Sequence, residues 1–443
     1  MNNAIANWWR SQRFKFAMRS GDLRNTNKIL QEIQKSGASL SWEEKLFRDK
    51  QQIESGLQES NRELASLKRR FLEASKQQNH QLNDFLLSPD LAFIDHINKV
   101  FQIVDHDEHK IQVTGIDQQI FDSFESGLVE YLEEEFNKFS QQKVASQLKE
   151  SLEDLNSLKI GKDPDYNFGF TAYVYFMKYF LENTYALYLA WFFIYKQGLL
   201  PTKINILDIA AGPATAAYSL ALFFQSCSRF FDLPQAHISY YSLEKQDGFQ
   251  YRGLQFWRKY IEQRMQHINT YFRFVTNDLF DEDFQYKNLP KEFFEFIVIS
   301  HCFFSDNDKR LASNDIYKKI FAHALKMNGY VLLIVQDKKL FRAFGIRQSE
   351  DEDQEKEIVN KFIEELDLEL VWYKYLTSTG LRTPLTLSEF AKLAQEKLPH
   401  QFHISLLLKK YAMQKYDNSY TLDDYVILAK KKVKILYNKL QCK

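Results

Sequence analysis

The sequence predicts a doubly wound α/β sheet that follows a helical N-terminal region. From residue 204 onward, short β-rich runs alternate with helical patterns, which is typical of a parallel sheet with helices on both faces. Before residue 160, the chain is rich in Gln, Glu, Lys and Leu and poor in Gly and Pro, a composition that favours helices. We therefore expect an all-helical segment first and an α/β domain after it.

Three regions are predicted along the 443 residues: a helical N-terminal domain (1–160), aromatic-rich helices that pack on the core (161–200), and the α/β domain (201–443). The boundary near residue 160 rests on Gly161-Lys-Asp-Pro164, since Gly and Pro disfavour helix continuation. Ser41 and Glu44 have the spacing of a capping box at a helix start. A narrow apolar stripe suits a bundle helix or a short coiled coil, and it comprises Ile53, Leu57, Leu64, Leu67 and Phe71.

The segment 168–198 is the most apolar and aromatic part of the chain. Lys178, Glu182 and Asn183 divide it into pieces shorter than the roughly 20 residues that cross a bilayer. We predict two buried helices or one broken helix here, and no membrane partner.

The composition excludes a strong global charge, because Lys plus Arg and Asp plus Glu both number 58. Three scattered cysteines without metal-type spacing fit a reducing compartment. The first residues carry charges before any long apolar run and do not resemble a secretory signal, so a cytoplasmic location is expected. His400 and His403 lack a third ligand at metal spacing, and no metal site is predicted.

The α/β region divides into alternating elements. The predicted strands are 205–209, 237–243, 272–275, 294–299 and 330–335. The predicted helices are 215–231, 254–268, 314–326 and 353–366. In such sheets the ligand lies at the carboxyl ends of the strands, so the residues directly after each strand are the candidates for a site.

The first of these turns runs from Asp208 to Thr215, with the sequence DIAAGPAT. Small residues let the backbone approach a ligand closely, and amides at the following helix N-terminus can meet a polar group. The turn resembles the first motif of class I S-adenosylmethionine-dependent methyltransferases, an acid followed by three alternating glycines. Asp208 matches the acid and Gly212 the middle glycine, while Ala210 and Ala214 stand where the family most often has glycine. The resemblance implies a Rossmann-like fold and S-adenosyl-L-methionine as cofactor.

Two further acids follow the next two strands. Glu244 can accept hydrogen bonds from both ribose hydroxyls, as the resemblance implies and as dinucleotide folds also do. Asp278 resembles the family's adenine-contacting acid, and Leu279 or Phe280 would pack on the ring. A lone acid after a strand is otherwise a common helix cap.

After the fourth strand come Ser300, His301 and Cys302, where the family places residues near the transferred methyl. Ser300 is assigned to the cofactor pocket. His301 could deprotonate a nucleophile, because its ordinary pKa lies near neutrality. Equally, it could hydrogen-bond a loop or line the cofactor pocket. An Asn-Pro-Pro-Tyr tetrapeptide of the amino-directed type is absent, and Cys302 is read as a small hydrophobe.

Beyond the fifth strand, methyltransferases of this class end with antiparallel strands, and the candidates are 370–375, 403–409 and 425–429. The segment around 377–400, helical from 385 to 398, would be an insertion over the site. A nicotinamide dehydrogenase is less favoured, because Gly-x-Gly-x-x-Gly fails at Ala210 and Thr215.

Two function classes stay open. The first is a methyltransferase that acts on an unidentified methyl acceptor. The second is a catalytically degenerate, methyltransferase-like binding or assembly factor that engages a protein or RNA partner through its N-terminal helices. The arm from Trp8 to Arg19 mixes aromatic and basic residues, which suits RNA stacking and equally suits an amphipathic helix docked on the body.

Overall fold

A computed structural model describes residues 2–20, 22–36, 41, 44–45, 86–157, 164–166, 168–264, 267–281, 284–304, 306–412 and 417–432. The chain forms two compact units, Met1–Asp84 and Phe85–Lys443. The predicted apolar stripe at 53–71 lies outside the described residues. Of the predicted capping box, one hydrogen bond is present, from the Ser41 amide to Glu44 Oε2 at 2.7 Å.

The first unit contains a helical hairpin of α1 (Asn2–Arg19) and α2 (Leu23–Lys35). Asp22 starts α2 because its side chain accepts a hydrogen bond from the Asn25 amide at 3.0 Å. The helices pack through a small core whose members are Phe14, Ala17, Ile29, Leu30 and Ile33.

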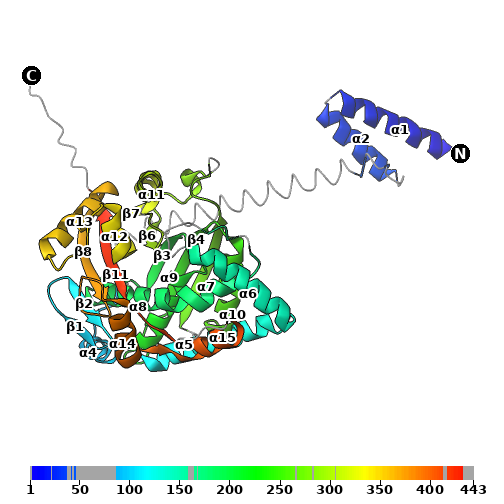
Figure 1. Cartoon of the computed structure of the whole chain (residues 1–443). Helices are drawn as coiled ribbons and strands as arrows, with labels where there is room; N and C mark the ends of the chain where they lie inside the picture. The colour runs from blue at the N-terminus through cyan, green and yellow to red at the C-terminus, as the bar shows by residue number, and fades with distance from the viewer. Residues whose placement is uncertain are drawn as a thin grey trace, which may run out of the picture. The chain divides into compact units, whose positions relative to one another are not determined.

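A nine-stranded sheet with the order β1-β2-β8-β11-β7-β6-β3-β4-β5 forms the centre of the second unit (Figure 1). Its strands are β1 (Ile103–Asp105), β2 (Lys110–Val113), β3 (Lys203–Ile209), β4 (Ala236–Glu244), β5 (Ile268–Thr276), β6 (Phe294–Ser300), β7 (Leu325–Gln336), β8 (Leu368–Thr377) and β11 (Asp423–Lys431). The five predicted strands correspond to β3, β4, β5, β6 and β7, so the α/β prediction is confirmed.

The strands β5, β4, β3, β6 and β7 run parallel to one another, whereas β11 is antiparallel to both of its neighbours, β7 and β8. The far edge is extended by β2, parallel to β8, and by β1, antiparallel to β2. The predicted N-terminal helical region thus supplies two short strands to the sheet as well as its helices.

Helices cover both faces of the sheet (Figure 1). One core cluster joins one sheet face to the helices α4 (Leu91–Val100), α5 (Gln118–Phe136), α6 (Gln141–Leu155), α8 (Leu181–Lys196), α9 (Thr215–Cys227), α10 (Asp247–Tyr260) and α15 (Phe402–Ala412). The other joins the opposite face to α11 (Asn307–Ala324), α12 (Asp337–Ala343) and α13 (Glu352–Glu365). The remaining elements are the short helix η4 (Tyr286–Asn288), α14 (Leu387–Lys397) and a small ribbon of β9 (His400–Gln401) and β10 (Asn418–Ser419).

The compact division after Asp84 differs from the boundary that the sequence analysis sets near residue 160. The reason is burial, because helices α4, α5 and α6 place apolar side chains in the same core cluster as α8 and α9. Pro164, at the predicted boundary, lies within this unit, and Gly161 lies outside the described residues.

The aromatic segment forms one helix with an irregular middle. α7 (Thr171–Tyr175) continues through a π-helical turn, η3 (Phe176–Phe180), into α8. Every residue of α8 from Thr184 to Tyr195 is buried, which explains why the sequence is apolar on all sides. Among the described helices, none is long and apolar enough to cross a membrane.

One predicted strand is wrong. Residues 403–409 belong to helix α15, not to a strand. The buried side chains Ile404, Ser405, Leu407 and Leu408 recur at intervals of three and four, which is a helical period. The antiparallel strand is instead β11, at the third predicted position, and the helix predicted for the insertion is α14.

Candidate functional site

The carboxyl ends of β3, β4, β5 and β6 lie along one edge of the sheet, because these strands are parallel and adjacent. The start of β11 reaches the same edge, since this antiparallel strand pairs Asp424 with Gln336 at the end of β7. All nine candidate site residues from the sequence follow or end strands at this edge.

The turn between β3 and α9 has an unusual backbone. Ala210, Gly212 and Ala214 have φ angles of 55°, 54° and 68°, all in the left-handed region that favours glycine. These are the three alternate positions that carry glycine in the motif the sequence resembles. Each alanine there costs roughly 1–2 kcal/mol relative to glycine. The turn therefore has the left-handed backbone typical of glycine at three positions, although only position 212 is a glycine.

Contacts from neighbouring elements hold this turn in place. The Ala211 amide donates to Leu243 O at 3.3 Å, and the Gly212 amide donates to Glu244 Oε2 at 2.8 Å. On α10, Gly253 lies so close to the turn that a β-carbon there would stand 2.5 Å from Pro213 O. The strained backbone is thus fixed by the end of β4 and by close packing on α10.

Asp208 is buried beneath the turn. Its carboxylate accepts a hydrogen bond from Tyr240 and another from the Ala216 amide in the first turn of α9. Burial raises the pKa of Asp208 to about 7, and the nearby Glu244 adds to this, while the two hydrogen bonds lower it. Asp208 therefore supports the turn and the helix N-terminus from below.

Glu244 lies beside the turn, at the end of β4. Its second oxygen accepts the Gln246 amide at 2.9 Å, so both carboxylate oxygens already bind backbone amides. Burial raises the pKa of Glu244 despite these hydrogen bonds. A carboxylate has about four acceptor positions, which leaves capacity for two hydroxyl donors.

Asp278 and Leu279 follow β5, next to the end of β4. Asp278 Oδ2 pairs with Lys245 Nζ at 2.9 Å, and its Oδ1 accepts the Phe280 amide at 3.0 Å. Partial burial alone would raise the pKa of Asp278, but the amide and Lys245 outweigh it and hold the pKa below its usual range. Leu279 packs against the core on the α11 side of the sheet.

Ser300, His301 and Asp424 form a hydrogen-bonded series at the end of β6. Ser300 Oγ lies 2.9 Å from His301 Nδ1, and His301 Nε2 lies 3.0 Å from Asp424 Oδ1. As a carboxylate, Asp424 can only accept, so Nε2 carries the proton and Nδ1 is the basic nitrogen that faces Ser300. The side chains of His301 and Asp424 are only 15% and 10% exposed.

The backbone of His301 is also left-handed, with φ of 61°, a strained conformation for a residue with a side chain. Two contacts hold it: its amide donates to Ile334 O at 2.9 Å, and Lys339 Nζ donates to its carbonyl at 3.3 Å. Non-glycine residues in this region cluster at functional sites, where surrounding contacts fix them.

The helix α7–η3–α8 connects the two parts of the edge. Tyr175, near its start, stands over the β3–α9 turn, since a β-carbon on Gly212 would lie 3.7 Å from Tyr175 Oη. Asn183 donates to this hydroxyl at 3.0 Å. Glu182 lies two turns after Tyr175, and its carboxylate accepts a hydrogen bond from the Thr421 hydroxyl at 2.7 Å. Thr421 precedes Asp424 by three residues. The π-helical turn lies between Tyr175 and Glu182, and such turns are frequent at functional sites.

The β11 side of the edge is rich in buried acids. Burial raises the pKa of Glu182 to about 7, of Asp423 to about 6 and of Asp337 to about 8. Asp424 contributes to the shifts of all three through like-charge repulsion. Burial and mutual repulsion therefore favour the protonated, uncharged forms of these acids.

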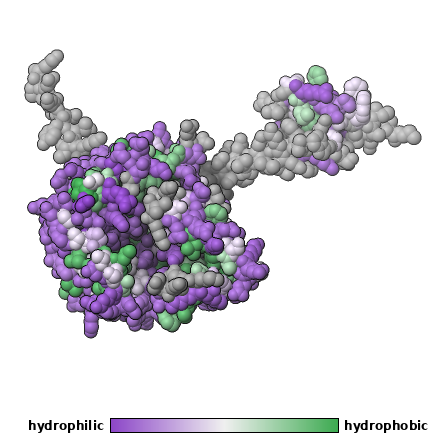
Figure 2. Space-filling model, viewed as in Figure 1, coloured by the Kyte–Doolittle hydropathy of each residue, from purple (hydrophilic) through white to green (hydrophobic). Residues whose placement is uncertain are grey.

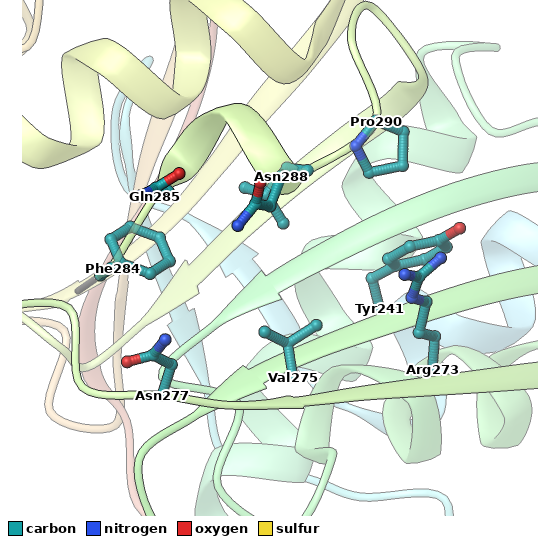
Figure 3. Close-up of a pocket in the computed structure, with 9 residues that line it drawn as sticks. Tyr241, Arg273, Val275, Asn277, Phe284, Gln285, Asn288 and Pro290 are labelled. Carbon is teal, nitrogen blue, oxygen red and sulfur yellow. The ribbon is translucent and has the colours of Figure 1, made fainter. Parts of the chain in front are cut away.

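A cavity of about 130 Å³ opens beside this edge, along β4 and β5 (Figure 3). Tyr241 and Arg273 lie side by side on the two strands, with the guanidinium 5.3 Å from the ring centre. The lining comprises Tyr241, Arg273, Val275, Asn277, Phe284, Gln285, Asn288, Leu289 and Pro290. None of the nine predicted site residues lines the cavity, although Asn277 directly precedes Asp278.

Sequence reasoning missed Asp424, Tyr240, Tyr175 and Glu182. Asp424 had a detectable signal, because an acid that begins an antiparallel strand at the end of the sheet reaches the carboxyl edge. Glu182 was noted only as an interruption of the apolar segment. Tyr175 and Tyr240 carried no signal beyond their aromatic character.

The strand order decides the fold type. The five parallel strands lie in the order β5-β4-β3-β6-β7. The antiparallel strand β11 comes next and separates β7 from β8. The fold is a doubly wound, Rossmann-like sheet, as the resemblance to class I methyltransferases implies. Its antiparallel strand is β11, which carries Asp424 to the site.

Solved structures of similar shape include methyltransferases. An S-adenosylmethionine-dependent methyltransferase from Methanosarcina mazei is 13% identical, with 52% of this chain and 94% of that chain covered and a TM-score of 0.31. A Haloferax volcanii putative methyltransferase in complex with the activator Trm112 is 11% identical (59% and 94% covered, TM-score 0.30). A fibrillarin/Nop5p complex is 14% identical (53% and 75% covered, TM-score 0.28). No family model matches the chain, and no curated protein matches its sequence.

Proposed function

We propose that the protein is an S-adenosylmethionine-dependent methyltransferase that acts on a protonated nucleophile. The observation that carries the proposal is the left-handed backbone at Ala210, Gly212 and Ala214, with Glu244 bonded to the middle residue. A turn of this shape at the carboxyl edge of a parallel sheet is suited to close approach by a ligand. Its strain persists because Glu244 and Gly253 hold it.

The residues present fit this cofactor. Glu244 would accept the ribose hydroxyls, Asp278 and Leu279 would hold the adenine ring, and the β3–α9 turn would lie against the amino-acid part. Asp208 would act as a positioning residue, since it is buried and bonded to Tyr240 and the Ala216 amide. When bound, the cofactor supplies an electrophilic methyl group on a sulfonium.

The other half of the edge would handle the acceptor. His301 Nδ1 would take a proton from the acceptor, directly or through the Ser300 hydroxyl that lies 2.9 Å away. Asp424 would hold the ring in the required tautomer and stabilise the imidazolium that forms. The rest of the rate enhancement would come from proximity and orientation.

Calorimetric titration with S-adenosylmethionine and its demethylated product tests the cofactor site. We expect the wild-type chain to bind both, and Glu244→Gln to weaken binding at least tenfold because a carboxylate acceptor pair is lost. Asp232→Asn is the matched control, since this exposed acid precedes β4 at the opposite edge of the sheet. Absence of heat from the wild type at millimolar ligand would contradict the proposal.

A second function, a methyltransferase-like binding factor without activity, is favoured by one observation. The amides of Ala211, Gly212 and Ala214 already have acceptors within the protein, namely Leu243 O, Glu244 and Ala211 O. A folded wild-type chain that binds no cofactor would support this function. A survey of a lysate with methyl-labelled cofactor would find an acceptor only under the first.

A further inference from the structure

The α1–α2 hairpin carries a basic and aromatic surface that methyl transfer does not use. Residues 2–35 contain seven Lys and Arg residues against two acids, whereas the whole chain has equal numbers of each. Helix α1 itself has four cations, Arg10, Arg13, Lys15 and Arg19, and no acid. The hairpin therefore attracts anions locally, although the chain as a whole is neutral.

Three large aromatic side chains of α1 are exposed. Trp8, Trp9 and Phe16 are 57%, 60% and 76% exposed, in a hairpin whose own core takes Phe14 and Ala17 from the same helix. Exposure of this size on three aromatic residues in two helical turns leaves a large apolar area in water. Packing in the hairpin core does not account for these three aromatic residues, because they are not members of that core.

The exposed rings and cations alternate on one side of the helix. Trp9, Arg13 and Phe16 follow at intervals of four and three residues, which places them in one row. Trp8 and Arg19 lie in the neighbouring row, eleven residues apart. Trp9 and Phe16 are about 10 Å apart along the axis. These five residues are called the outer face of α1.

We propose that the outer face of α1 binds single-stranded nucleic acid, with bases stacked on Trp8, Trp9 and Phe16 and phosphates paired with Arg13 and Arg19. Alternation of aromatic rings and cations along a strand path is the general means of binding unpaired nucleic acid. Arg13 can exchange its partner for a phosphate, because its ion pair with Glu32 is 3.9 Å long and both side chains are exposed. The proposal does not depend on the cofactor site.

A lipid surface fits this face less well. A helix that lies in a membrane interface needs one continuous apolar side. In α1 the apolar residues point two ways, because Phe14 and Ala17 are buried in the hairpin while the exposed rings alternate with Arg, Gln and Ser. Figure 2 shows mostly hydrophilic residues on the visible side of the hairpin, with separate hydrophobic spots.

Fluorescence anisotropy of the full chain with labelled 12-nucleotide RNA, DNA of the same sequence and the RNA duplex tests the proposal. We expect single strands to bind more tightly than the duplex. Trp9→Ala and Phe16→Ala should each weaken binding about fivefold or more, the effect of one lost stack. Arg13→Gln should reduce the slope of log affinity against log salt by about 0.7. A difference between RNA and DNA would identify the sugar that is preferred.

Phe402→Ala is the matched control, because Phe402 is 62% exposed on α15 in the other unit. Its affinity should stay within twofold of the wild type. Phe14→Ala removes an aromatic ring from the hairpin core and should abolish binding. Trp9→Ala and Phe16→Ala should retain the wild-type helical circular dichroism. Affinity for the cofactor, measured on the same variants, should not change.

Three outcomes would overturn the proposal: no binding of single strands at 50 mM salt, equal binding of duplex, or equal losses in Phe402→Ala. Binding to phosphatidylserine vesicles without binding to oligonucleotides would identify a membrane surface instead. A chain that binds oligonucleotides but no S-adenosylmethionine would refute the proposed function and leave this inference in place.

Discussion

The two halves of the carboxyl edge are built in different ways. The half around β3, β4 and β5 uses hydrogen bonds between adjacent strands, such as the one from the Gly212 amide to the Glu244 carboxylate, 32 residues apart. The half around β6, β7 and β11 uses side chains that are distant in sequence. His301 and Asp424 are 123 residues apart, and Glu182 and Thr421 are 239 apart.

Under the proposed function, this difference would separate cofactor binding from proton transfer. The first half presents amides and carboxylates in a rigid turn, which suits a ligand of fixed shape. The second half presents a histidine oriented by an acid, which suits proton removal from a variable acceptor. Substitutions in the first half should therefore leave proton removal unaltered, and substitutions in the second half should leave cofactor affinity unaltered.

The largest effect is expected at His301. His301→Asn should lower the rate of methyl transfer to a lysate acceptor by about 10²–10⁴-fold, the usual contribution of a general base, with cofactor affinity within twofold of the wild type. Asp424→Asn should cause a smaller loss and change the pH profile of the rate, because the tautomer is no longer fixed. Asp423→Asn is the control, since Asp423 binds Tyr375 rather than His301. Equal losses in all three variants would contradict the assignment.

The next effect concerns the turn in the first half. Gly253→Ala places a β-carbon 2.5 Å from Pro213 O, so the turn must shift; overpacking of this kind costs about 1–3 kcal/mol. Gly248 lies on the same helix with no atom within 4 Å of the added carbon, and Gly248→Ala is the matched control. Thermal unfolding and calorimetric titration should show lower stability and weaker cofactor binding for Gly253→Ala alone. Similar results for the two variants would show that the turn tolerates displacement.

A third test uses the pH dependence of stability. The pKa of Asp208 rises from 3.8 to about 7 on folding, so its favourable contribution is complete below pH 4 and is lost as the pH rises to 7. The stability of Asp208→Asn relative to wild type should therefore increase between pH 4 and 7, by about 1.4 kcal/mol for each unit of pKa shift. Chemical denaturation at several pH values measures this difference. A difference that is independent of pH would contradict it.

The fold was largely predictable because its signals are local. Buried parallel strands are runs of apolar residues, and the turn after β3 shows its small residues directly. Residues 403–409, in helix α15, were predicted as a strand because a short apolar run of seven residues fits a strand nearly as well as a helix. The predicted domain boundary near residue 160 differs from the compact division after Asp84. Glycine and proline mark a break in a helix, but they give no information on which core the next helix joins.

The candidate site was predictable only in its first half. Asp208, Glu244 and Asp278 each follow a strand, and strand ends can be read from a sequence. The pairing of His301 with Asp424 depends on the antiparallel insertion of β11 between β7 and β8. That insertion is a property of the whole sheet, so the sequence could place an acid of β11 at the edge but could not pair it with His301.

The smallest expected effect tests the alanines in the turn. Ala214 is the N-cap residue of α9, with φ of 68° and ψ of 42°, so Ala214→Gly should remove the strain and raise stability by about 1 kcal/mol. Ala216→Gly, two residues into α9, should instead lower stability by about 1 kcal/mol, because glycine is unfavourable within a helix. Thermal unfolding measures both. If Ala214→Gly also tightens cofactor binding, its methyl group crowds the ligand; if only stability rises, the methyl is accommodated. A loss of stability would mean that position 214 is not left-handed, and the comparison with the glycine motif would fail.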